Sequence, residues 1–158
     1  MCSSVKCSIF VEENEIVMNE YKIKDLEKDA VSRLNESDVA YALINKTVNS
    51  HCILALKEET GISGELLSGW LHMTSKTLRS YLTRKISLPE TVGEQVLLLT
   101  SLFRLGVVVF GSVKVFEVWL NRENGMLDGL KPVDLLGSVS GIRLIESRLY
   151  GIEYGDNT

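Results

Sequence analysis

The fold is decided by the stretch LLSGWLHMTSKTLRSYL, residues 66–82, whose pattern predicts two short helices separated by a tight turn. Leu67, Trp70 and Leu71 occupy positions i, i+3 and i+4, so they form the apolar face of the first helix. Thr74 can cap the start of the second helix with its hydroxyl group. Two short helices joined by a turn of about three residues match the helix-turn-helix motif.

A cationic surface is expected on the second helix. Leu78 and Leu82 lie four residues apart, and if they face the core, helical geometry turns the other side chains outward. Four cations fall between Lys76 and Lys85 with no carboxylate among them, although the net charge of the chain is −4. Polar side chains at a helix start can approach base edges while Lys and Arg pair with phosphates, so this helix predicts DNA binding.

The predicted DNA-binding residues are Thr74, Ser75, Lys76, Thr77, Arg79, Ser80, Thr83, Arg84 and Lys85. A basic run is also typical of a solvated surface, so the alternative is a helical packing unit whose cations only face water.

The composition favours a folded, water-soluble chain. Its 158 residues are 45% hydrophobic, which is enough to bury a core. Three cysteines without a CxxC pair fit reduced thiols better than a disulfide framework or a zinc site. The N-terminal residues lack a secretory signal, so a cytoplasmic location is expected. The apolar run from Val96 to Phe110 falls short of the roughly 20 residues of a membrane span, and Arg104 and Gly106 interrupt it.

Catalysis is not expected. The chain has two histidines, His51 and His72, and it lacks a glycine-rich phosphate loop, an HExxH motif and a nucleophile with a spaced histidine and acid. We therefore predict no catalytic residue, no metal ligand and no cofactor.

The C-terminal half predicts further helices and hence a mainly all-α fold. Residues 92–110 form a helix that is apolar on more than one side. Gly111 and Ser112 provide a stop and a cap, a device that Gly137 and Ser138 repeat, and Pro132 suits a first helical position. Apolar residues at helical spacing follow in two later helices: Phe116, Trp119 and Leu120, then Ile142, Ile145, Leu149 and Ile152.

The first motif resembles the Xre-type helix-turn-helix of bacterial antitoxins. The matching positions are Leu67, Leu71, Met73, Thr74, Lys76, Thr77, Leu78 and Leu82. His72 stands where many such turns use glycine for its left-handed conformation, a region that histidine visits more readily than most residues.

The C-terminal half is similar to the toxin-binding domain of the Xre/MbcA/ParS antitoxins. The motifs that carry the resemblance are Phe110-Gly111-Ser112, Trp119-Leu120, Leu127 with Gly129, Pro132 with Asp134-Leu135-Leu136, Gly141, and Ile152-Glu153-Tyr154-Gly155. Together the two resemblances cover residues 45–158.

The chain departs from the family pattern in three places. Gly151 replaces an arginine, Asp128-Gly129 replaces a double glycine, and Lys131 replaces a Thr or Ser cap. We expect Gly151 to alter one polar contact with the toxin and to end the last helix early.

The resemblance implies an antitoxin whose partner is a RES-type toxin, an ADP-ribosyltransferase-like enzyme that consumes NAD. It also implies that the C-terminal end occludes the active site of the toxin, with Glu153 facing cationic groups and Tyr154 packed in the cleft. The predicted toxin-binding residues are Tyr150, Ile152, Glu153, Tyr154 and Gly155. Without the resemblance, these side chains indicate ordinary packing and a solvated carboxylate.

The resemblance further implies a homodimer that binds operator DNA upstream of its own gene. Two recognition helices related by a two-fold axis can meet half-sites about one helical turn apart. The helix over 92–110 is a candidate dimer surface, unless it is buried in its own fold. The alternative function is a stand-alone helix-turn-helix transcriptional regulator without a toxin partner.

The expected organisation is an N-terminal arm of unknown role at 1–35, with a possible short strand, a helix-turn-helix domain at 36–90 and a toxin-binding domain at 91–158.

Overall fold

The computed structural model describes residues 48–84 and 86–155. The possible N-terminal strand or arm and the DNA-binding candidate Lys85 lie outside this range. In the described ranges the only strand-like pairing is an isolated antiparallel bridge between Asn49 and Ser87. The predicted all-α fold is confirmed.

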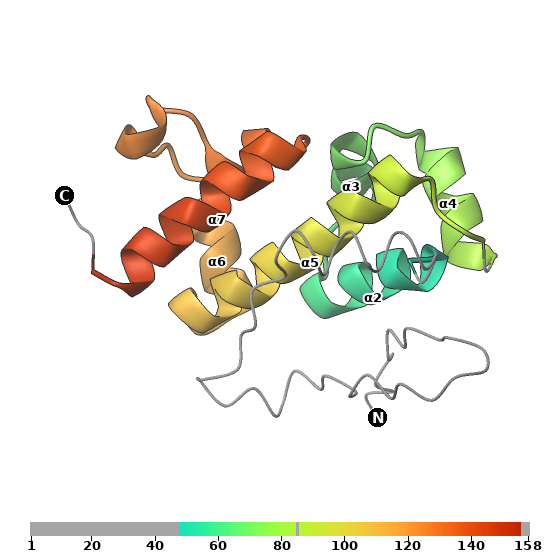
Figure 1. Ribbon diagram of the computed structural model, residues 1–158, viewed down its shortest axis with the longest axis horizontal. Coiled ribbons are helices and arrows are strands. Elements are labelled where there is room, and N and C mark those ends of the chain that lie inside the picture. The colour runs from blue at the N-terminus through green and yellow to red at the C-terminus, as the bar shows by residue number, and fades with distance from the viewer. Residues whose placement is uncertain (1–47, 85, 156–158) are drawn as a thin grey trace.

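One long helix organises the fold. The elements are α2 (Ser50–Thr60), α3 (Gly64–Trp70), α4 (Ser75–Thr83), α5 (Glu90–Phe110), α6 (Val113–Leu120), η2 (Gly125–Leu127), η3 (Pro132–Leu135) and α7 (Val139–Glu153). Figure 1 shows α2, α3 and α4 gathered around the first half of α5, and α6 and α7 around its second half. The helix-turn-helix elements and the C-terminal elements therefore share α5.

The helix ends follow capping signals in the local sequence. Gly61 and Gly111 adopt left-handed conformations, with φ of 70° and 82°, and follow the last residues of α2 and α5. At four other ends a side-chain hydroxyl oxygen accepts a backbone N–H of the first helical turn; these caps are Ser63, Thr74, Ser112 and Ser138. Local sequence thus sets most of the element boundaries.

The end of α7 corrects the sequence prediction. Gly151 does not end the helix, which continues to Glu153. A glycine inside a helix costs only about 1 kcal/mol, and here the preceding turn is fixed by the fully buried Leu149. The backbone N–H of Tyr154 still donates to the carbonyl oxygen of Tyr150 at 2.9 Å. Packing therefore overrides the weak local preference of Gly151.

The other difference lies between α6 and α7. None of the predicted helices covers the segment 121–131, yet it contains the short helix η2. Pro132 begins a helix as predicted, but this helix, η3, has 3₁₀ geometry and only four residues. Proline fits the first position of either helix type because the backbone N–H it lacks has no helical partner there.

The core is one continuous cluster built on α5. Val96, Leu99 and Leu102 are each at most 1% exposed. The same cluster includes Leu67 from α3 and Ile145 from α7. Because both halves bury apolar side chains against the same helix, each half contributes to the stability of the other.

Aromatic rings close the corner between α5 and α6. The rings of Phe103 and Phe116 meet edge to face at 5.3 Å, and Phe110 stacks on Phe116 at 5.8 Å. Trp119 lies 5.5 Å from Phe110. The predicted apolar face of α6 is therefore packed on the end of α5.

The helix α5 is longer than the apolar run from Val96 to Phe110. The helix has 21 residues, so its length and composition alone would suit a membrane span. Half of its most apolar window is buried inside the protein, however, and α2, α6 and α7 pack against it. Both features are those of a core helix.

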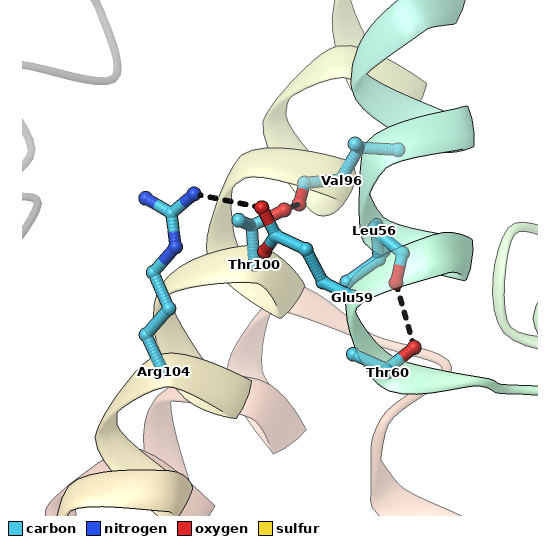
Figure 2. Close-up of polar contacts among 6 residues, drawn as sticks. All are labelled: Leu56, Glu59, Thr60, Val96, Thr100 and Arg104. Carbon is cyan, nitrogen blue, oxygen red and sulfur yellow. Dashed lines mark hydrogen bonds and ion pairs between the residues drawn. The ribbon is translucent and has the colours of Figure 1, made fainter. Parts of the chain in front are cut away.

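Arg104 joins α5 to α2. Its Nη2 donates to Glu59 Oε1 at 3.4 Å, as Figure 2 shows, and both side chains are partly buried. Nearby hydroxyl groups are satisfied within their own helices: Thr60 donates to the carbonyl of Leu56, and Thr100 to that of Val96. The charge that interrupts the apolar run of α5 thus has a partner on α2.

Two glycines permit close helix packing. A Cβ at Gly106 would overlap the ring of Phe116. A Cβ at Gly141, in the first turn of α7, would overlap the backbone carbonyl of Leu135 in η3. A backbone atom cannot move aside as a flexible side chain can, so η3 can approach α7 this closely only because residue 141 is glycine.

We expect Gly141→Ala to lower the free energy of unfolding by about 1–3 kcal/mol, the usual cost of overpacking, although alanine favours helix. Urea unfolding measures this change. Gly69→Ala is the matched control, because Gly69 is helical and exposed and has nothing within 4 Å of the added methyl. An equal loss in both variants would contradict this account of Gly141.

Candidate functional site

The described DNA-binding candidates lie on and beside α4. The exposed ones are Thr74, Ser75, Lys76, Thr77, Arg79, Thr83 and Arg84, whereas Ser80 is half-buried. Leu78 faces the core at 2% exposure, and Leu82 is only partly buried. Within residues 48–84 and 86–155, Lys76, Arg79 and Arg84 form no ion pair. Because these three side chains are exposed, an anionic partner can reach them.

The threonine hydroxyl groups on and beside α4 form hydrogen bonds within the helix. Thr74 caps the helix by accepting the N–H of Thr77 at 3.1 Å, and the two threonine hydroxyls share a hydrogen bond of 2.9 Å. The Thr83 hydroxyl donates to the carbonyl of Arg79 at 3.0 Å. These threonines stabilise the helix itself, which leaves Ser75 and the cations as the groups best placed to contact a ligand.

The end of α4 is anchored to the start of α2. The hydroxyl of Ser50 donates to the carbonyl of Arg84 at 2.7 Å and accepts the N–H of Ile86 at 3.1 Å. Ser50 is itself only 2% exposed. The backbone at the C-terminal end of the basic segment is therefore held by a buried side chain from another helix.

The turn before α4 has the conformation expected at residue 72. His72 has φ of 52°, in the left-handed region. Its ring Nε2 lies 2.6 Å from the carbonyl oxygen of Gly137. Because a carbonyl can only accept, Nε2 carries the proton and donates. The ring thus contacts the segment that leads into α7.

The tail candidates lie at the end of α7 and are mostly exposed. Tyr150 is half-buried, whereas Tyr154 is 75% exposed, and their rings stack at 6.4 Å with an interplanar angle of 18°. Glu153 is exposed, and Gly155 has φ of 77°. The end of α7 therefore presents a carboxylate and an aromatic ring to solvent.

Ile152 corrects the predicted apolar stripe of α7. Ile142, Ile145 and Leu149 are each at most 1% exposed, but Ile152 is 39% exposed. It lies one turn beyond Leu149, next to the last residue of α7. Ile152 is therefore an apolar group that faces outward.

A second set of apolar side chains surrounds the middle of α7. Leu144 is 41% exposed, and Arg148 follows it at i+4 and Ile152 at i+8, which places the three on one side of the helix. The Nη2 of Arg148 donates to the carbonyl of Met126 at 3.4 Å, so the η2 loop lies beside them. Met126 is 50% exposed.

We define the α7 apolar face as Met126, Leu130, Leu144 and Ile152. Leu130 belongs to the same loop as Met126 and is 51% exposed. Grouped exposed apolar side chains rimmed by polar residues are typical of a protein interaction surface. The sequence predictions missed Met126, Leu130 and Leu144. The signal was that Leu144 lies off the stripe of Ile142, Ile145 and Leu149 in an amphipathic helix.

The comparison with known families assigns this region. Residues 105–155 match the family model of the antitoxin Xre/MbcA/ParS C-terminal toxin-binding domain. This segment is similar to an antitoxin toxin-binding domain. No curated protein matches the chain. The matched residues run from the second half of α5 to the last described residue, so they include both the α7 apolar face and the tail.

The family motifs of the matched segment differ in their structural roles. Gly111 and Ser112 form the corner between α5 and α6, and Gly141 allows η3 to contact α7. These motifs build the domain. The motif from Ile152 to Gly155 is exposed and supports no core packing. This last motif is therefore available to a partner.

Proposed function

We propose that this protein is an antitoxin that inhibits a cognate RES-type, NAD-consuming toxin by placing its C-terminal tail in the active site of the toxin. The family match supports a toxin partner. The single observation that carries the inhibition mechanism is the exposed tail at the end of a firmly packed helix: Leu149 is fully buried while Tyr154, five residues later, is 75% exposed.

Inhibition in this proposal is occlusion rather than chemistry. The Glu153 carboxylate pairs with cationic groups of the toxin that otherwise hold NAD phosphates. The Tyr154 ring packs in the cleft, and its stacking on Tyr150 already restricts it in the free protein. A tail held in place by α7 loses little conformational entropy on binding, which favours affinity.

The α7 apolar face is the surface on which we place the toxin. It is continuous with the tail through Ile152, and apolar side chains next to a plugging segment can supply the affinity that a few polar contacts lack. In this division of roles, the face holds the toxin and the tail blocks it.

The helix-turn-helix elements serve operator binding. Lys76, Arg79 and Arg84 are exposed on α4 and at its end, where they can neutralise phosphates, and Ser75 lies at the helix start where base edges are read. A homodimer would present two such helices to two half-sites. The division into an arm at 1–35, a helix-turn-helix domain at 36–90 and a toxin-binding domain at 91–158 remains a prediction, as does a cytoplasmic location.

The alternative is a DNA-binding regulator without a toxin partner. The basic surface of α4 favours it as much as it favours an autoregulating antitoxin, because both bind an operator. The two functions differ in whether the tail inhibits a toxin.

We expect the full-length protein to abolish NAD consumption by the neighbouring RES-type toxin, and the variant lacking residues 152–158 to inhibit at least about tenfold less well while still forming the complex. NAD consumption and co-purification are the measurements. The truncation removes described side chains that are exposed, so its melting temperature should change by no more than about 4 °C. Full inhibition by the truncated protein would exclude the plug, and inhibition by neither would favour the regulator.

We expect Leu144→Asp to weaken the complex with the toxin by about 10- to 100-fold, because it places an unpaired charge in an apolar contact. Calorimetric titration measures the affinity. Val118→Asp is the matched control, since Val118 is a 53% exposed apolar residue of the same domain on α6. Equal losses in both variants would show that the toxin is not held by the α7 apolar face.

We expect the double change Lys76→Ala with Arg79→Ala to weaken operator binding and to lower the salt slope of log K by about 2 per protomer, because two phosphate contacts are lost. Fluorescence anisotropy over a salt series measures both. Lys114→Ala with Arg122→Ala removes two exposed cations of the toxin-binding domain and should leave the slope unchanged. An unchanged slope in the α4 variant would remove α4 from the DNA interface.

A further inference from the structure

Two side chains connect the turn before α4 to the segment that precedes α7. Gln95, on α5, is 7% exposed, and its Nε2 donates to the carbonyl of Trp70 at 2.7 Å and to that of Leu136 at 3.2 Å. His72 donates to the carbonyl of Gly137 at 2.6 Å. Three hydrogen bonds therefore converge where the helix-turn-helix meets the toxin-binding domain.

The carbonyls that Gln95 contacts are at helix ends. Trp70 is the last residue of α3, and Leu136 follows the last residue of η3, so neither oxygen has a partner within its own helix. One buried amide satisfies both. A buried donor that is shared between two elements fixes their relative position, because a shift of either element leaves a buried carbonyl unpaired.

His72 adds a contact that glycine could not make. Glycine adopts a φ of 52° more readily than histidine does, so the backbone alone gives no reason for a side chain at this position. The imidazole supplies the reason, since its Nε2 reaches Gly137 across the boundary between the two halves. His72, which stands where such turns usually have glycine, therefore forms a hydrogen bond between the two halves.

These contacts lie next to the starts of both α4 and α7. Thr74, the cap of α4, lies two residues after His72, and Ser138, the cap of α7, directly follows Gly137. The hydrogen bond between His72 and Gly137 places the segment before α7 against the turn that leads into α4. Otherwise α4 packs mainly on α2 and α3. The turn therefore joins the segment before α7 to the segment before the DNA-binding helix.

We propose that His72 and Gln95 are positioning residues that tie the start of α4 to the start of α7, so that toxin binding on α7 and DNA binding on α4 are energetically coupled. This inference rests on the proposed function, since it needs both ligands. By linkage, any factor by which the toxin changes operator affinity is also the factor by which DNA changes toxin affinity.

The first test needs no ligand. His72→Gly removes the ring while glycine keeps the backbone conformation without strain. Amide hydrogen exchange in residues 73–78 should become about five- to tenfold faster, which corresponds to the loss of one hydrogen bond. Asp128→Gly is the matched control, because Asp128 is the other non-glycine residue with positive φ in the described part of the chain. It should leave this exchange unchanged, and wild-type exchange rates in His72→Gly would overturn the proposal.

The second test measures coupling. The dissociation constant for DNA from the region upstream of the gene is measured with and without saturating RES-type toxin. In the full-length protein the two values should differ by at least about fivefold, and in His72→Gly their ratio should fall to within about twofold of one. Equal values in the full-length protein, or an unchanged ratio in the variant, would overturn the proposal.

Gln95→Met provides an independent variant, since it keeps the length of the side chain and removes both donors. It should abolish the coupling as His72→Gly does. If Gln95→Met fails to fold, His72→Gly decides the proposal alone. If the full-length protein binds neither DNA nor toxin, the proposed function fails, and the exchange experiment still decides whether His72 holds the turn.

Discussion

The structure depends on the burial of α5 from both sides. Val96, Leu99 and Leu102 contribute to a cluster that reaches α3 at one end and α7 at the other. An isolated pair of helix-turn-helix helices, or α6 and α7 without α5, would leave much of this apolar surface in water. The surfaces on α4 and α7 are consequently presented by one packed body, and their geometry relative to each other is set by the same core.

Most of the fold could be predicted because its boundaries depend on local chemistry. Gly61 and Gly111 end helices through left-handed conformations, and Thr74 and Ser138 cap helix starts with their own hydroxyls. Such signals act over a few residues and are visible in sequence. The extension of α7 through Gly151 could not be predicted, because it depends on packing around the turn before it.

The candidate sites were predictable to different degrees. The cations of α4 could be identified because a single helix carries them together. The α7 apolar face could not, since it combines one side of a helix with a loop that Arg148 holds in place through Met126. Gln95 was missed for a similar reason: its two acceptors are 25 and 41 residues away in sequence, so its role exists only in the folded chain.

The shared helix also bears on how the protein is removed from a cell. A protease that gains access to α5 through unfolding destroys the packing of α4 and α7 together, because both depend on the same cluster. Cleavage within α5 then leaves no fragment that keeps one activity and loses the other. In the proposed function, turnover of a single molecule would release the toxin and the operator in the same event.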